Sequence, residues 1–315
     1  MRVRACSINH LDLHVGRGNP AYKIDLPHVL GSDIAGEIIS AGPETELGGT
    51  PVGSKVIVSP GISCWECRAC RCGRDNICES YAILGADGGW GGYAEIAVVP
   101  VKNLLPFPKA DLTFEAAASY PLTFLTAYHM LKGLARVREG ETVLVVGAGS
   151  GVGAAAIQIA KALGAKAIAT SSAKEKLEYA RELGADETIH TGSEKLTKCV
   201  KRLTAGRGAD IVFEHVGGAI FADAVRLLAP GGRLATCGAT AEPKVDLDLR
   251  YVFFKELQIL GAKMGTLTEL REIGALIEAG KLHPAVSRVF PLTEARQAQE
   301  YLAARKQFGK VVLRT

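Results

Sequence analysis

The stretch Glu141–Ala165, ETVLVVGAGSGVGAAAIQIAKALGA, decides the fold of the central part of the chain. Thr142–Val146 is an apolar run rich in β-branched residues, which is typical of a strand buried on both faces. Gly147–Gly153 (GAGSGVG) lets the backbone turn sharply and approach a ligand closely. Ala154–Leu163 then repeats small and aliphatic residues at helical spacing, up to Gly164. A strand, a glycine turn and a helix predict a phosphate-binding unit, since the turn and the helix N-terminus present N–H groups.

The glycine turn departs from the strict G-x-G-x-x-G pattern. When the run is aligned on its last glycine, Gly153, Ser150 stands where a glycine is usual. A tight turn without any ligand is the alternative, but the flanking strand and helix favour a dinucleotide. We therefore predict that Gly149, Ser150, Gly151 and Val152 bind the cofactor.

The residues after the second strand of this unit bear on the choice between NAD and NADP. An acidic residue at this place binds the ribose 2′-hydroxyl of NAD and repels the 2′-phosphate of NADP. The strand Ala167–Thr170 is followed by Ser171 and Ser172, which are uncharged and can donate to phosphate, and then by Lys174 and Lys176. The serines can instead merely cap the next helix, and a glutamate lies between the lysines, so NAD stays possible. We predict NADP, bound in part by Ser171 and Lys176.

Strands and helices alternate from the glycine turn onward. Expected strands are Ala167–Thr170, Glu187–His190, Asp210–His215, Gly232–Cys237 and Glu256–Leu260, and expected helices are Ala173–Leu183, Ser193–Thr204 and Ile220–Leu228. Such alternation predicts right-handed crossovers and a doubly wound parallel sheet. Val216 and Gly238, each directly after one of these strands, complete the predicted cofactor site.

The flanking parts of the chain are richer in short strands and loops. Expected strands are Asp33–Ile39, Ser54–Ser59, Ala94–Val99 and Lys310–Leu313, and expected helices are Thr113–Ser119, Thr123–Leu134 with a break near Pro121, and Leu267–Ala279. No long helical pattern precedes Thr113. The sequence therefore predicts a mostly β part before the α/β part and a return to shorter elements after Met264.

Five of the eight cysteines crowd into one short segment. Cys64, Cys67, Cys70 and Cys78 have the spacing of a closed four-thiolate zinc site, which is structural because no position is left for substrate. A redox-active C-x-x-C or chance crowding are the alternatives. Cys72 breaks the spacing and is taken as a non-ligand, although an exchange with Cys70 stays open.

Composition excludes several classes of protein. The net charge is +4, with 48% hydrophobic and 22% charged residues, and no basic run or membrane-length apolar run occurs. These values predict a globular chain without nucleic-acid or membrane partners. Cysteines in a metal pattern rather than a disulfide pattern predict a reducing, cytoplasmic location.

Several motifs together resemble the medium-chain dehydrogenase/reductase superfamily. These are NHLDL (Asn9–Leu13), LGSDIAGEI (Leu30–Ile38), PLTFLTAYHML (Pro121–Leu131) and FGKVVL (Phe308–Leu313), together with the cysteine loop and the glycine turn. The chain looks closest to zinc-containing alcohol dehydrogenase-like proteins that grade into NADPH:quinone reductases. The resemblance implies an α/β fold with two domains and a homodimer or homotetramer paired through the strand near Glu256–Gly261. The implied GroES-like catalytic domain spans residues 1–118 and 265–315, and the Rossmann domain spans residues 119–264.

The chain departs from this resemblance in two places. Family members carry further residues before the segment that matches Val3–Asn9, so N-terminal strands are expected to be missing. The alcohol dehydrogenases hold a catalytic zinc with a cysteine at the position of Asn9, a histidine at Ser32 and a cysteine or carboxylate at Leu122. Asn, Ser and Leu are poor zinc ligands or none, so we expect a metal-free pocket. The nearby His10, His14 and His28 are expected to be surface or hydrogen-bonded side chains.

A pocket without a metal favours substrates that are already electron-poor. A simple alcohol or carbonyl needs the polarisation that zinc supplies, whereas a quinone or an α,β-unsaturated carbonyl delocalises the charge it receives. The resemblance places Asn9 toward the nicotinamide and substrate and Thr126 beside the nicotinamide or its ribose, while Asp12 is either part of the site or a structural cap. The predicted function is hydride transfer from NADPH to a quinone or enone. A zinc-type alcohol dehydrogenase and a non-catalytic NADPH-binding protein are the alternatives.

Overall fold

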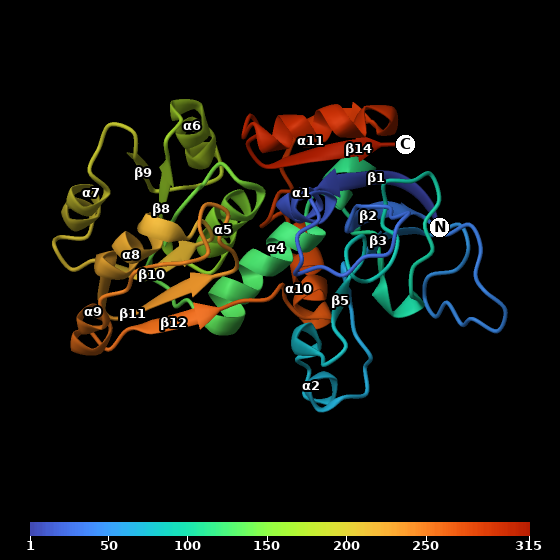
Figure 1. The fold of residues 1–315 in the computed structure, drawn as a ribbon, viewed down its shortest axis with the longest axis horizontal. Coiled ribbons are helices and arrows are strands. Elements are labelled where there is room, and N and C mark those ends of the chain that lie inside the picture. Colours follow the sequence, from blue (N-terminus) through green and yellow to red (C-terminus); the bar gives the residue numbers. More distant parts are fainter. The chain divides into compact units, whose positions relative to one another are not determined.

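The computed structural model describes residues 1–315, and the chain forms two compact units. The first unit consists of Met1–Leu125 and Gly265–Thr315, and the second of Thr126–Met264. Figure 1 shows the elements of both units in sequence colours. No helix has the length and apolar character needed to cross a membrane.

The first unit is built on a six-stranded sheet with the order β13-β14-β1-β2-β3-β6. Its strands are β1 (Arg2–Ile8), β2 (Asp33–Glu37), β3 (Lys55–Val58), β6 (Leu104–Pro106), β13 (Val286–Pro291) and β14 (Lys310–Arg314). All neighbouring pairs are antiparallel except β13 and β14, which are parallel. Strand β1 is therefore paired on both sides, by β14 and β2, and the sheet edges are β13 and β6. A separate two-stranded sheet pairs β4 (Gly61–Ile62) with β5 (Ala82–Ile83).

Short helices surround this sheet. They are α1 (His10–Gly16), α2 (Arg68–Arg71), α3 (Phe114–Ala118), α10 (Leu267–Glu278) and α11 (Ala295–Ala303), with the 3-10 turns η1 (Asp75–Ile77), η2 (Val101–Asn103) and η4 (Leu292–Glu294). Helix α11 packs through Ala298 and Leu302 against Val311 and Leu313 of β14. The helix α4 (Pro121–Tyr128) starts at the proline where a break was expected, because a proline at the first helical position has no N–H to lose.

The second unit contains a parallel sheet with the order β12-β11-β10-β7-β8-β9. Its strands are β7 (Thr142–Val145), β8 (Lys166–Ser171), β9 (Glu187–His190), β10 (Ala209–Glu214), β11 (Leu228–Thr236) and β12 (Gln258–Gly261). Strands β7, β8 and β9 follow one another toward one edge of the sheet. Strand β10 then pairs with the other side of β7, and β11 and β12 follow toward the opposite edge. The doubly wound sheet predicted from the sequence is confirmed, and its strand order reverses between β7 and β10.

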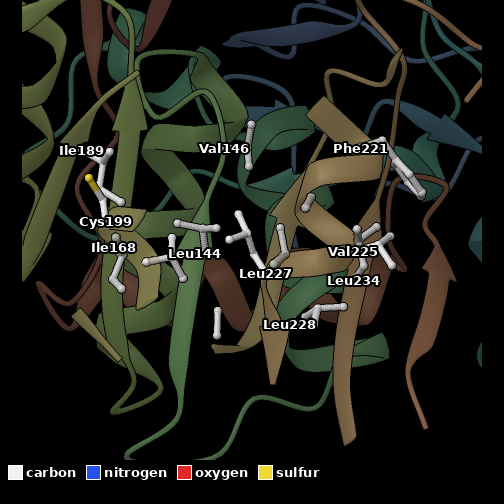
Figure 2. Packing of buried hydrophobic residues seen from close by; sticks show 14 of the residues in the cluster. Leu144, Val146, Ile168, Ile189, Cys199, Phe221, Val225, Leu227, Leu228 and Leu234 are labelled. Carbon is white, nitrogen blue, oxygen red and sulfur yellow. The ribbon is translucent and has the colours of Figure 1, made fainter. Parts of the chain in front are cut away.

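Helices cover this sheet and enclose its core. They are α5 (Gly151–Ala162), α6 (Lys174–Glu182), α7 (Leu196–Leu203), α8 (Gly218–Leu227) and α9 (Leu249–Phe254), preceded by the π-helical segment η3 (His129–Leu134). Figure 2 shows Leu144, Ile168, Leu227 and Leu234 among the side chains that fill one layer of the core, each at most 4% exposed. The core thus holds the carboxyl ends of the strands in fixed positions.

Some expected elements differ from the structure. Ala94–Val99 is not a strand and makes only an isolated bridge between Ile96 and Arg2. The helix expected at Ala154–Leu163 begins three residues earlier, because the Ser150 hydroxyl caps it by accepting the N–H of Gly153 at 3.0 Å. The helix expected from Ser193 begins only at Leu196.

Candidate functional site

The four predicted zinc ligands lie together. The sulfurs of Cys64, Cys67, Cys70 and Cys78 are all within 4.8 Å of one another. Cys64 Sγ lies 3.4 Å from Cys78 Sγ and 4.0 Å from Cys70 Sγ. Zn–S bonds of about 2.3 Å in a tetrahedron place sulfurs about 3.8 Å apart, so these residues fit a structural zinc ion.

Backbone N–H groups of the cysteine loop stabilise negative charge on the cysteine sulfurs. The N–H of Cys67 donates to Cys64 Sγ at 3.3 Å, and the N–H groups of Cys64 and Ser80 donate to Cys78 Sγ at 3.3 and 3.4 Å. Cys72 is exposed and lies outside the group of four sulfurs. The arrangement favours Cys70 over Cys72 as the fourth ligand.

The glycine turn of the second unit is shaped by a histidine that the sequence analysis did not single out. Gly147 has φ +71°, and a Cβ atom there would lie 2.9 Å from His215 Nε2. Only glycine therefore fits, both sterically and conformationally. His215 Nε2 also lies 3.2 Å from the Ser150 hydroxyl. Burial lowers the pKa of His215, so the imidazole is neutral near pH 7.

The predicted cofactor residues gather at the carboxyl ends of the strands. A Cβ atom on Gly149 would lie 2.3 Å from Lys176 Cδ, so the lysine stem passes directly over the glycine turn. Ser171, the last residue of β8, accepts the N–H of Ala173 at 3.2 Å, which leaves its own hydroxyl hydrogen to donate. A dinucleotide fits this end of the sheet, because the N-terminus of helix α5 lies there behind a glycine-rich turn.

A buried glutamate builds the loop that carries the remaining two cofactor residues. The Glu214 carboxylate accepts the N–H groups of Val216 and Gly217 and lies 3.5 Å from the Thr236 hydroxyl. Thr236 in turn donates to the carbonyl of Gly238 at 3.2 Å. Burial raises the pKa of Glu214. Val216 is thus held by the Glu214 carboxylate at the end of β10, and Gly238 by the Thr236 hydroxyl at the end of β11.

In the first unit, Asn9 belongs to a buried polar cluster with Asp33 and Lys310. Asn9 Nδ2 donates to Asp33 Oδ2 at 2.9 Å, and Lys310 Nζ donates to Asn9 Oδ1 and, at 3.1 Å, to Asp33 Oδ2. Asp33 also accepts the Ser7 hydroxyl at 3.0 Å and the N–H of Leu122 at 2.8 Å. Asp33 is fully buried, and Asn9 and Lys310 are 6% and 4% exposed. Sequence reasoning missed Asp33 and Lys310 as site residues.

Asp12 holds the backbone around this cluster. Its carboxylate accepts the N–H groups of Asn9 at 2.7 Å and Gly31 at 3.2 Å, and the Tyr93 hydroxyl at 3.1 Å. Burial raises the pKa of Asp12 to about 6, against the hydrogen bonds and the Lys310 charge, which lower it. These contacts support the structural interpretation of Asp12. Thr126 is buried in α4 and belongs to the second unit.

The residues of the Asn9 cluster do not fit a catalytic zinc ion. The four-cysteine loop is the group in which three or more His, Cys, Asp or Glu ligand atoms converge. Ser32 offers a buried hydroxyl that makes no hydrogen bond, and Leu122 contributes only its backbone N–H. Asp33, the carboxylate beside them, already accepts four donors. A donor set of amide, hydroxyl and ammonium leaves a divalent cation without its preferred ligands.

Comparison with known proteins places this architecture among the two-domain oxidoreductases. Residues 1–109 match the alcohol dehydrogenase GroES-like domain, and residues 151–279 match the zinc-binding dehydrogenase family. A zinc-type alcohol dehydrogenase-like protein of Schizosaccharomyces pombe is 32% identical, with 100% of this chain and 90% of the relative covered. A crotonyl-CoA reductase of Streptomyces collinus is 32% identical over 91% of this chain and 68% of the relative.

Solved structures agree with the sequence relatives. A crystal structure of an NAD-dependent alcohol dehydrogenase has a TM-score of 0.95 at 44% identity, covering 100% of this chain and 90% of that one. The chain belongs to the medium-chain dehydrogenase/reductase superfamily, in its zinc-type alcohol dehydrogenase-like branch. It is an oxidoreductase with a GroES-like domain and a Rossmann domain.

Proposed function

We propose that this protein reduces quinones or α,β-unsaturated carbonyl compounds with NADPH and without a catalytic metal. The observation that carries the proposal is the cluster of Asn9, Asp33 and Lys310, in which the amide and the ammonium are hydrogen-bond donors and the one carboxylate is already occupied by four donors. When bound, NADPH supplies a hydride to the β-carbon of the enone or to the quinone ring. The substrate's own oxygen takes up the displaced electron pair, and water supplies the proton that completes reduction.

Asn9 has a donor to offer to such an oxygen. Its Nδ2 carries two hydrogens and uses one, toward Asp33. The second can be donated to an oxygen on which negative charge develops, and one preorganised donor of this kind is worth about 10²–10³ in rate. Thr126 is proposed to contact the nicotinamide or its ribose.

The cofactor is proposed to be NADPH, held at the carboxyl ends of the strands of the second unit. No carboxylate occupies the end of β8, where Ser171 stands, and Lys176 lies over the glycine turn. We expect Ser171→Asp to lower the ratio of kcat/KM for NADPH to that for NADH by at least about tenfold, through repulsion of the 2′-phosphate. Ser172→Ala is the control, and an unchanged ratio in Ser171→Asp contradicts the assignment.

A zinc-type alcohol dehydrogenase is the second candidate, because several relatives carry that name. An NAD-dependent alcohol dehydrogenase of Sulfolobus acidocaldarius is 32% identical over 100% of this chain, whereas a quinone oxidoreductase-like protein of Nematostella vectensis is 31% identical over 99%. A panel of enones, quinones and short alcohols, assayed with NADPH and NADH, separates the two. Robust alcohol oxidation with two zinc ions per chain contradicts the proposal; enone or quinone reduction with one zinc ion supports it.

We also propose that the protein pairs through the edge strand β12. Near this edge Leu249, Phe253 and Phe254 are 60–78% exposed, and Ile259 of β12 is 40% exposed. An unpaired strand edge beside exposed aromatic side chains suits a second copy of the chain. Phe254→Glu is expected to shift the protein toward monomer in analytical ultracentrifugation, whereas Lys306→Glu, the substitution of an exposed residue of the first unit, is not.

A further inference from the structure

Lys310 is a buried cation that compensates the buried carboxylate of Asp33. Asp33 is fully buried on β2, and a carboxylate removed from water is costly unless a cation or several donors compensate it. Lys310, the first residue of β14, lies 277 positions further along the chain and places its Nζ 3.1 Å from Asp33 Oδ2. Its side chain is only 5% exposed.

The same ammonium and the Asp33 carboxylate together determine how the Asn9 amide is turned. An ammonium group only donates hydrogen bonds and a carboxylate only accepts them. The Asn9 amide bridges the two, with Oδ1 on Lys310 and Nδ2 on Asp33. The reverse orientation would oppose two donors at Lys310 and two acceptors at Asp33, so only one orientation is compatible with both partners.

We propose that Lys310 is a positioning residue that helps to fix the Asn9 amide so that its second Nδ2 hydrogen is available to the substrate oxygen. The proposal rests on the proposed function, because it assigns Asn9 the donor role in that reaction. Lys310 does not itself exchange a proton or an electron. It supplies the fixed positive charge and the fixed hydrogen bond that make one orientation of Asn9 the stable one.

The test separates positioning from mere charge compensation. Lys310→Met approximately keeps the stem length and removes the ammonium, which leaves Asp33 with its neutral donors only and removes the partner of Asn9 Oδ1. Lys310→Met combined with Asp33→Asn removes both buried charges, so the unfolding midpoint should recover. The orientation of Asn9 is still unconstrained in this double variant, because an amide at position 33 can both donate and accept.

Steady-state kinetics on a reducible enone or quinone give the main readout. We expect kcat to fall roughly tenfold to a hundredfold in both variants, within the range for losing one oxyanion donor, while KM for NADPH stays within about twofold. Lys306→Met, the same change at an exposed lysine, should leave both constants unchanged. Recovery of both the unfolding midpoint and kcat in the double variant overturns the proposal, as does wild-type kcat in Lys310→Met.

A second readout does not depend on turnover. In a ¹⁵N–¹H spectrum, the Asn9 side-chain amide, assigned by its loss in Asn9→Ser, should show two widely separated proton shifts, because one hydrogen faces a carboxylate. This separation should narrow already in Lys310→Met, where the Asp33 carboxylate is kept and only the hydrogen bond to Asn9 Oδ1 is lost. If the wild type reduces no enone or quinone, the proposed function fails while the spectrum still tests Lys310. An amide signal that is identical in wild type and variants overturns the positioning role.

Discussion

The hydroxyl of Tyr93 offers a test of how the buried carboxylate of Asp12 is stabilised. Tyr93 donates to Asp12 Oδ2 at 3.1 Å, and Asp12 is fully buried. Tyr93→Phe removes this donor and also a hydrogen bond to the Gln299 side chain, which does not titrate and so costs the same at each pH. A hydrogen bond to a charged acceptor contributes about 1.5–3 kcal/mol, whereas one to a neutral acceptor contributes about 1 kcal/mol. The cost of the substitution should therefore depend on whether Asp12 is ionised.

The sign follows from the pKa of Asp12, which burial raises from 3.8 to about 6. A carboxyl group with a raised folded-state pKa favours the folded state most at low pH, and this contribution is lost as pH rises through about 6. Tyr93 opposes that loss, because its hydrogen bond lowers the pKa. At pH 8 we expect Tyr93→Phe to cost about 2 kcal/mol, and at pH 5 about 1 kcal/mol. The difference of about 1 kcal/mol corresponds to a further rise of about 0.7 pKa unit in the variant.

The assay is urea unfolding followed by tryptophan fluorescence at pH 5 and pH 8. Both tryptophans, Trp65 and Trp90, lie in the first unit, so fluorescence reports the unit that contains Asp12. Tyr301→Phe is the control, because its hydroxyl donates to the backbone carbonyl of Lys306, which does not titrate. A cost of Tyr93→Phe that is equal at the two pH values, or larger at pH 5, refutes the reasoning.

Two further predictions concern the cysteine loop and the second unit. Cys78→Ser should reduce the zinc content of the purified protein well below one ion per chain, measured by elemental analysis, while Cys72→Ser retains it because that thiol lies outside the cluster; equal zinc in both variants contradicts the ligand set. Arg233→Met should lower the free energy of unfolding by about 2 kcal/mol, because this side chain is 13% exposed, pairs with Glu141 and donates to a backbone carbonyl. Arg226→Met removes an exposed ion pair and should lower the free energy of unfolding by less than about 0.5 kcal/mol. Thermal unfolding measures both. Similar losses in the two arginine variants contradict the argument from burial.

The α/β unit was predictable because its signals are local. The run Thr142–Val146 and the glycines after it specify a strand, a turn and a helix within one short stretch, and β9 runs from Glu187 to His190 as the sequence predicts. The buried parallel strands are apolar on both faces, so they stand out from their surroundings. Register and helix starts were less predictable, because a side-chain cap such as Ser150 moves a boundary by several residues.

The first unit was less predictable because its pairing is long-range. Ala94–Val99 has the composition of a strand, yet its pairing with Met1–Val3 is limited to one bridge, between Ile96 and Arg2, and the hydrogen bonds beside it. Helix α1 has seven residues, which is too few to show a helical hydrophobic period. Strand β13 and helix α11 carry polar residues that weaken their hydrophobic patterns. Tertiary contacts decided these elements, and a single sequence does not display them.

The site shows the same division between local and long-range information. The cysteine spacing is local, and the four sulfurs converge as predicted. The role of Asn9 cannot be predicted from neighbouring residues in the sequence, because it depends on the carboxylate of Asp33 on β2 and the ammonium of Lys310 on β14. Asparagine at this position removes a metal ligand, but Asp33 still has to be compensated in the buried pocket. Lys310 supplies the compensation.

Restoring zinc ligands at Asn9 and Ser32 while keeping Lys310 would place a divalent cation in the same pocket as a fixed ammonium, where like charges repel. The proposed absence of a catalytic metal therefore rests on four residues together, Asn9, Ser32, Asp33 and Lys310, and we expect that substituting the ligands alone does not create a metal site.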